Sequence, residues 1–435
     1  MKSRKSYRRV AVKDVSAEYL RDQAIGHGGP STTVGLDIGK EEILVVVRWG
    51  QDHFERPWLV SNPNEIGLLI ERLTLLRTTS DHVRVALEST GTYGEAVRRA
   101  LTEARFDVHR VSTKAASDYA EIFDGVPSKH DGKDAAILAE LTAFGKSVSW
   151  PFVEAGEEEQ QREHDVLRMD AYRKQMTTWT GRLEGLLAKH WPELTHFLDL
   201  SSPTLLEMLK HYGSPADLLA DPRATERFQA WSKGLLKETK ILSILASAKE
   251  TAGVPASAAA KTWLQEVAGE ALSAYRQLQR LESQLKKGAA NHAGIQRLAC
   301  LGVPTVCVLF ATVGDPDDYD SAGAYLKALG LNLKERSSGK RVGELAITKR
   351  GPSAARRWLF YLALRSVQRP EIKPWYEAKK QRDQTYGKMK GLVGVMRKLA
   401  RAIWHVSRTG EAFDWGKVFP GRPLACSAAG ERTGE

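Results

Sequence analysis

The sequence predicts three architectures in succession: a mixed α/β domain, a region of long helices and a mainly α-helical domain. Two apolar strands at 34–39 and 42–49 open the first domain, and strands then alternate with helices. Apolar residues recur every three or four positions over 166–186 and 264–285, which is the period of amphipathic helices. Helical patterns dominate again from Gly294 onward.

The order of its elements defines the α/β domain. The first two strands turn at Gly39-Lys40, which predicts a hairpin, and further strands are expected at 83–88 and 106–111. Helices are expected at 63–77, 94–104 and 113–145. A hairpin followed by alternating strands and helices indicates a mixed sheet.

The two long helical stretches have a repeat close to 3.5 residues over about three heptads. This repeat favours either an antiparallel helical hairpin or a coiled coil between subunits. A packed helical domain without a role in dimerisation is the alternative. Shorter helices are expected around 203–212 and 224–248.

The C-terminal domain is expected to be helical apart from one polar loop. Helices are expected at 306–313, 321–330, 353–367 and 373–405, with a Gly/Ser/Lys-rich loop at 334–343. The whole chain therefore divides into a flexible basic arm at 1–30, an α/β domain at 31–150, a helical or coiled-coil region at 151–290, a C-terminal domain at 291–410 and a disordered tail at 411–435. For residues 1–30, the alternative to a basic arm is a disordered segment without a role.

The charge balance favours a polyanionic partner. The 435 residues include 64 Lys and Arg against 53 Asp and Glu, so the formal net charge is +11. Nucleic acid is the first candidate and an anionic membrane surface the second. There is no run of about 18 apolar residues and no secretory signal, and the three cysteines form no metal-ligand pattern. These features predict a cytoplasmic protein without a transmembrane segment.

Four acids occupy positions where a carboxylate needs a partner. Asp37 interrupts an apolar strand and Glu88 ends another, while Asp131 and Asp134 are three residues apart at the start of a helix and share one face of it. If the two strands are neighbours and the helix packs against their ends, all four carboxylates converge.

Converging carboxylates repel one another, and a hard divalent cation relieves that repulsion. Mg²⁺ prefers oxygen ligands, and a pair of such ions suits phosphodiester chemistry, with Mn²⁺ as the expected substitute. The order of strand Asp, hairpin, strand Glu and helix Asp/Asp is the layout of a ribonuclease H-like nuclease core. Asp131 and Asp134 taken alone are more typical of a solvated helix start.

The polar loop holds two adjacent serines, Ser337 and Ser338, among many cations. A serine hydroxyl is a poor nucleophile unless neighbouring groups activate or position it. The surrounding cations could grip a phosphate: Arg336, Lys340, Arg341, Lys349 and Arg350, with Arg356 on the following helix. Taken alone, such a stretch is more typical of a basic surface loop.

These stretches together resemble the DEDD insertion-sequence transposases, the IS110 family. The resemblance rests on Val-Gly-Leu-Asp-Ile-Gly-Lys at 34–40, Ala-Leu-Glu-Ser-Thr-Gly-Thr-Tyr at 86–93 and Lys-His-Asp-Gly-Lys-Asp-Ala at 129–135. It extends to 322–331, Ser337-Ser-Gly and Ile-Thr-Lys-Arg-Gly at 347–351. The sequence departs from the family pattern where Leu-Gly-Val-Pro, Gly-Leu-Asn-Leu and Gly-Pro stand at 301–304, 330–333 and 351–352.

The resemblance implies a RuvC-like first domain whose acids Asp37, Glu88, Asp131 and Asp134 hold Mg²⁺. It also implies that Ser338, rather than Ser337, is a nucleophile that forms a transient phosphoserine bond to DNA. The implied partners are target and donor DNA, a noncoding bridge RNA, and further copies of the chain in homodimers that assemble into homotetramers. The implied location is the bacterial cytoplasm, at the nucleoid.

Three other interpretations are open. The first is a metal-dependent RuvC-like nuclease or junction resolvase in which the serine is inert. The second is an ATPase of the actin and hexokinase type, but Lys40 stands where that family has Thr or Ser. The third is a nucleic-acid-binding protein without catalysis. Loss of activity in the Asp37→Asn variant, at unchanged DNA affinity, would exclude this interpretation.

Overall fold

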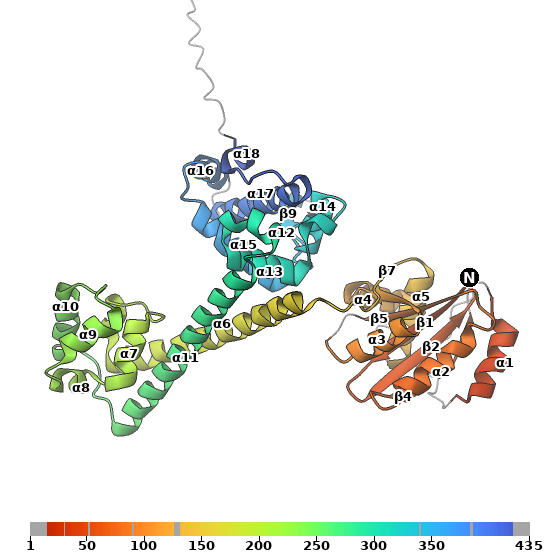
Figure 1. Cartoon of the computed structure of the whole chain (residues 1–435), viewed down its shortest axis with the longest axis horizontal. Helices are drawn as coiled ribbons and strands as arrows, with labels where there is room; N and C mark the ends of the chain where they lie inside the picture. Colours follow the sequence, from red (N-terminus) through yellow and green to blue (C-terminus); the bar gives the residue numbers. More distant parts are fainter. Residues whose placement is uncertain are drawn as a thin grey trace, which may run out of the picture. The chain divides into compact units, whose positions relative to one another are not determined.

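The chain is described by a computed structural model (Figure 1). The structure describes 15–29, 31–50, 53–88, 91–125, 131–338, 341–382 and 386–420, and at Asp131, 336–338 and 341–344 the backbone alone. The residues form two compact units, Met1–Glu154 and Ala155–Glu435. Among the described helices, none is long and apolar enough to cross a membrane.

The first unit is built on a seven-stranded sheet in the order β3-β2-β1-β5-β6-β7, with β4 beside β2. Its strands are β1 (Ser31–Ile38), β2 (Glu42–Trp49), β3 (His53–Phe54), β4 (Trp58–Ser61), β5 (His82–Glu88), β6 (Asp107–Val111) and β7 (Ser147–Ser149). β1 pairs antiparallel with β2 and parallel with β5, and β5 pairs parallel with β6. The predicted mixed sheet is therefore confirmed.

Helices cover both faces of this sheet. The helices are α1 (Ala17–His27), α2 (Ile66–Leu76), α3 (Glu95–Glu103), α4 (Thr113–Asp124) and α5 (Asp131–Ala143). One core joins α1, α2 and α3 to side chains such as Leu36, Val85 and Val108. The second core joins α4 and α5 to the other face, through Val46 and Ala86.

The flexible arm predicted at 1–30 is wrong for 17–27, which form α1. Ser16 caps this helix, because its hydroxyl accepts a hydrogen bond of 3.1 Å from the Tyr19 amide. Leu20 and Ala24, four residues apart, are buried in the core and hold the helix against the domain. Residues 1–14 lie outside the described part of the chain.

One glycine in β1 allows α5 to pack closely on the sheet. A Cβ added at Gly35 would lie 1.8 Å from the Ala135 carbonyl oxygen, so nothing larger fits. We expect Gly35→Ala to lower the free energy of unfolding by about 3 kcal/mol or more, since a rigid helix backbone must move. Urea unfolding measures this effect.

The matched control is Gly67→Ala in α2, where an added Cβ meets nothing within 4 Å. Alanine there should stabilise the helix by about 0.5–1 kcal/mol, because glycine is the poorer helix former. Equal effects of the two substitutions would contradict the close approach of α5 to β1.

The second unit begins with two long helices, α6 (Glu157–His190) and α11 (Ala258–Gly288), joined by shorter ones. Val166 and Met169 share a core with Leu281 and Leu285. The opposite end of α6 shares another core with the start of α11, so the two helices run antiparallel. Their periodic apolar residues therefore pack within one chain, as the predicted antiparallel helical hairpin requires. The helices between them are η2 (Pro192–His196), α7 (Pro203–Tyr212), α8 (Pro215–Ala220), α9 (Ala224–Ser232) and α10 (Glu238–Lys249).

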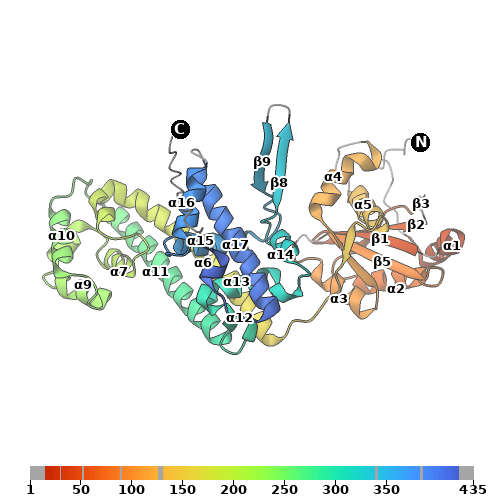
Figure 2. The same ribbon diagram turned by 90° about the horizontal axis from the view of Figure 1, so that it is seen from above.

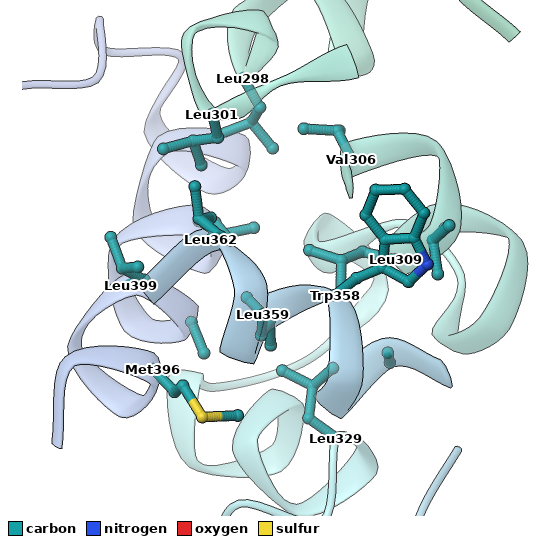
Figure 3. Packing of buried hydrophobic residues seen from close by; sticks show 14 of the residues in the cluster. Leu298, Leu301, Val306, Leu309, Leu329, Trp358, Leu359, Leu362, Met396 and Leu399 are labelled. Atoms are coloured by element: carbon teal, nitrogen blue, oxygen red, sulfur yellow. The ribbon is translucent and has the colours of Figure 1, made fainter. Parts of the chain in front are cut away.

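The C-terminal part of this unit packs its helices around one core, which includes Leu309, Trp358, Leu362 and Met396 (Figure 3). Its helices are α12 (Ala293–Arg297), η3 (Ala299–Leu301), α13 (Val303–Val313), η4 (Pro316–Asp318), α14 (Ala322–Ala328), α15 (Ser353–Ser366), α16 (Lys373–Gln381), α17 (Gly387–Thr409) and α18 (Trp415–Val418). The predicted mainly α-helical C-terminal region is confirmed.

Two predictions for this region are wrong. The loop predicted at 334–343 belongs to a β-hairpin, β8 (Leu333–Ser338) and β9 (Arg341–Ile347), which stands out from the helices (Figure 2). The tail predicted as disordered from 411 contains α18, and Phe419 is buried, because its ring packs edge-on against Trp375 at 5.5 Å. Residues 421–435 lie outside the described part of the chain.

Candidate functional site

Two of the predicted acids end neighbouring parallel strands. Leu36 of β1 pairs with Leu87 of β5, so the next positions, Asp37 and Glu88, lie side by side. The two strands are 51 positions apart in sequence, and their pairing is a product of the tertiary fold. Both acids are half-buried.

Both acids project toward the face that α5 covers. Gly35 faces the α5 backbone, and Ala86 belongs to the core on that face. Side chains alternate between the faces of a strand, so Asp37 and Glu88, each two positions further on, share this face.

The direction of α5 brings its first turn to the same strand ends. Arg84, near the start of β5, donates a hydrogen bond of 3.4 Å to the Thr142 carbonyl oxygen near the end of the helix. The helix therefore runs antiparallel to β1 and β5, and its first turn, with Asp131 and Asp134, lies toward Asp37 and Glu88.

Metal binding by these acids stays a prediction. Among the side chains that the structure describes, no three His, Cys, Asp or Glu are grouped closely enough to hold a metal ion. That set includes Asp37, Glu88 and Asp134, so these three do not form such a group, and the side chain of Asp131 lies outside the described part of the chain. The donor chemistry fits a hard cation, because all four groups offer carboxylate oxygens.

A buried ion pair fixes the start of α5. The Lys133 ammonium donates a 2.7 Å hydrogen bond to Asp124 at the end of α4, and the two side chains are 1% and 2% exposed. This pair links the end of α4 to the start of α5. It therefore fixes the backbone on which Asp131 and Asp134 stand.

Removing one partner of this pair is expected to be costly. Lys133→Met removes the ammonium partner of the buried Asp124 carboxylate, so we expect a loss of about 3–5 kcal/mol in the free energy of unfolding. Chemical denaturation followed by tryptophan fluorescence measures it.

Lys114→Met is the matched control, because it breaks the exposed pair with Asp118 on α4 and should cost less than about 1 kcal/mol. The double variant Asp124→Asn/Lys133→Met should recover much of the loss. A similar small effect of both lysine substitutions would contradict the buried pair.

The predicted nucleophile stands at the tip of the β8–β9 hairpin. Ser338 is the last residue of β8 and pairs with Arg341, and the register shifts between Arg336 and Ser338. Lys340 lies outside the described residues, and nothing is described of the side chains of Arg336 and Arg341. The structure therefore places the serine backbone at the end of a projecting two-stranded ribbon.

Two arginines hold the base of this hairpin. Arg356 of α15 donates hydrogen bonds to the carbonyl oxygens of Gly351 at 2.7 Å and Leu329 at 3.3 Å. Arg397 of α17 donates to the Leu331 carbonyl. Burial lowers the pKa of both guanidinium groups. Arg356, predicted to bind nucleic acid, thus contributes to hairpin geometry.

The other two predicted cations are available to a ligand. Lys349 and Arg350 follow β9 and are exposed. Lys349 adopts a φ of 57°, unusual for a residue with a side chain, in the turn that leads to α15. These two residues remain candidates for phosphate contacts.

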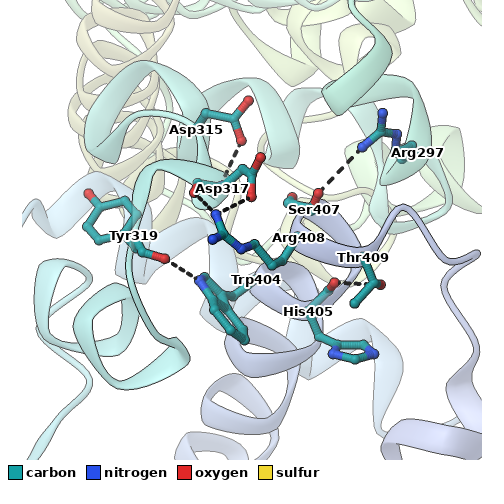
Figure 4. A network of polar contacts seen from close by, with 9 residues as sticks. All are labelled: Arg297, Asp315, Asp317, Tyr319, Trp404, His405, Ser407, Arg408 and Thr409. Atoms are coloured by element: carbon teal, nitrogen blue, oxygen red, sulfur yellow. Dashed lines mark hydrogen bonds and ion pairs between the residues drawn. The ribbon is translucent and has the colours of Figure 1, made fainter.

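A further basic element is α17, which overlaps the helical stretch predicted at 373–405 and contains none of the predicted site residues. Its C-terminal end is fixed by polar contacts (Figure 4): Trp404 donates to the Tyr319 carbonyl at 2.8 Å, and Arg408 contacts the Asp317 carboxylate at 3.2 Å. Trp375 packs against Gly394, where an added Cβ would lie 2.8 Å from its ring. These aromatic residues therefore orient the helix within the fold.

Comparisons with known proteins assign the chain to a class of DNA-processing enzymes, the transposases. Residues 34–192 match the DEDD transposase model of the IS110 type, and 294–379 match the model described as transposase IS116/IS110/IS902 family. The chain belongs to the IS110 family of transposases, which cleave and rejoin DNA.

A curated relative agrees with this assignment. The chain is 22% identical over 304 residues to the insertion element IS110 uncharacterized 43.6 kDa protein of Streptomyces coelicolor. The aligned part covers 68% of this chain and 74% of the relative. The DEDD type of the family indicates the use of a divalent metal ion.

Proposed function

We propose that this transposase cleaves and rejoins DNA with a RuvC-like carboxylate site and a serine nucleophile. Asp37, Glu88, Asp131 and Asp134 hold Mg²⁺, and Ser338 forms a phosphoserine bond to DNA. The main supporting observation is the arrangement of β1, β5 and α5, in which the strand ends that carry Asp37 and Glu88 and the first turn of α5 lie at the same end of the sheet. Bound Mg²⁺ would supply charge stabilisation to the transferring phosphoryl group.

The residues of the chain perform the remaining steps. The Ser338 Oγ bonds to phosphorus, a DNA oxygen leaves, and the serine proton passes through water to that oxygen. A hydroxyl of the second DNA strand then attacks the phosphoserine and returns the proton to the serine. Each step exchanges one phosphodiester for another, so no nucleotide cofactor is consumed.

The projecting hairpin suits this role because the nucleophile must reach a phosphate on a large substrate. The positive charges of Lys349 and Arg350 near the hairpin favour phosphate binding. Target and donor DNA are the substrates, and a noncoding bridge RNA pairs with both. Homodimers that assemble into homotetramers bring carboxylate and serine sites together, in the bacterial cytoplasm at the nucleoid.

A covalent adduct tests the serine chemistry. Purified protein is incubated with end-labelled DNA that carries the ends of its element, with Mg²⁺ and with the RNA that co-purifies with it. Labelled DNA should migrate with the protein on a denaturing gel, and EDTA should abolish this band. Cleaved DNA without any adduct would favour the nuclease alternative, in which the serine is inert.

Sequencing of co-purified nucleic acid tests the RNA partner. The protein is expressed beside its native flanking DNA, and bound nucleic acid is extracted. A discrete structured RNA from the flanking sequence is the expected product. Random fragments alone would contradict guidance by a bridge RNA.

A further inference from the structure

α17 combines high positive charge with a complete lack of acids. Its 23 residues include no Asp or Glu. The helix carries six cations: Lys388, Lys390, Arg397, Lys398, Arg401 and Arg408. Two of them stand in the first turn, where the helix dipole disfavours positive charge. Such a helix is electrostatically unfavourable by itself, which points to a compensating anion.

Four of the cations form one row. Lys390, Arg397, Arg401 and Arg408 are separated by seven, four and seven positions, so they fall within about 40° of the helix circumference. The buried residues of α17, such as Val395 and Leu399, lie on the opposite side. At 1.5 Å per residue the row is about 27 Å long, which equals the rise of about eight base pairs of duplex DNA.

The protein neutralises this row only in part. Arg408 pairs with Asp317, and Arg397 donates to the Leu331 carbonyl. Arg401 is exposed, and no carboxylate in the described part of the chain is found in an ion pair with it. The positive charge of Arg401 adds to burial in lowering the pKa of Arg397 and of Lys398, so the three cations are close together.

The row passes the base of the β8–β9 hairpin. Arg397, within the row, contacts Leu331, two positions before β8 begins. Duplex DNA along the row would therefore run beside the hairpin that bears Ser338. This proximity favours DNA over RNA as the occupant, because the DNA is what a transposase cuts.

We propose that the exposed cations of this row, Lys390, Arg401 and Arg408, bind the sugar-phosphate backbone of duplex DNA beside Arg397, which holds the hairpin base. The contacts are to phosphates, so they add affinity and fix the position of the duplex without reading its sequence. The proposal rests on the assignment of the chain as a transposase. It does not require the serine chemistry, because binding precedes cleavage.

Equilibrium binding tests the proposal. Fluorescence anisotropy of a labelled element-end duplex is measured with the full chain in EDTA, over a series of NaCl concentrations. For Arg401→Gln, the slope of log affinity against log salt should fall by about 0.9, and affinity at 0.15 M salt should fall about fivefold. The double variant Lys390→Gln/Arg401→Gln should lose about twice as much slope.

Arg280→Gln on α11 is the matched control, because it removes the same charge from an exposed position. It should leave the salt slope unchanged, and the thermal midpoints of all variants should match. Unchanged DNA binding by Arg401→Gln, or an equal loss in the control, would overturn the proposal. A loss seen only with an RNA duplex of equal length would overturn it in favour of RNA. The assay contains EDTA, in which the proposed metal-dependent cleavage does not proceed, so its outcome is independent of the serine mechanism.

Discussion

Ser338→Ala is expected to abolish strand transfer and the covalent protein–DNA adduct, with a loss of at least about 10⁴-fold in rate. Without the attacking oxygen, only DNA binding and charge stabilisation remain to accelerate the reaction. Removal of a nucleophile in other enzymes lowers the rate by this order of magnitude. The backbone at this position pairs with Arg341 at the hairpin tip, and alanine preserves that pairing. Gel assays of labelled DNA under single-turnover conditions measure both quantities.

Ser337→Ala is the matched control for this prediction. The two serines are adjacent, and the proposed function assigns the nucleophilic role to Ser338 and no role to Ser337. The Ser337 variant should retain recombination within about tenfold of the original rate. Normal recombination by Ser338→Ala would refute the serine mechanism, and loss confined to Ser337→Ala would transfer the role to that residue.

Asp37→Asn is expected to lower the rate of DNA cleavage by about 10³-fold or more while DNA affinity stays within twofold. Asparagine retains the shape but removes a charged oxygen ligand from the proposed metal site beside Glu88. Initial rates of cleavage over a Mg²⁺ titration measure the loss. Higher Mg²⁺ should restore little of it, because one ligand is missing.

A readout independent of activity separates metal binding from a structural role. Ligand binding to the native state stabilises it, so Mn²⁺ should raise the thermal midpoint of the unsubstituted protein. In Asp37→Asn that rise should disappear. Asp81→Asn, exposed just before β5 at the far end of the strand, is the matched control and should keep the metal-dependent rise.

Local patterns account for what could be predicted about the fold. The β1–β2 hairpin and the two long helices follow from apolar periodicity, which reports burial over a few residues. The same reasoning missed α1, because two buried apolar residues are a weak pattern beside a basic terminus. It also missed the β8–β9 hairpin, whose polar composition is typical of a loop.

For the candidate site, the sequence and the tertiary structure decided different properties. The sequence determined which chemical groups were available: four acids, two adjacent serines and an excess of cations. The tertiary structure alone decided that Asp37 and Glu88 are neighbours, that Arg356 binds carbonyl oxygens at the base of the hairpin and that Arg401 is exposed. The physical reason is that residue type and periodicity are local properties. Strand register, helix direction and the distance between charges arise from packing between residues far apart in the chain.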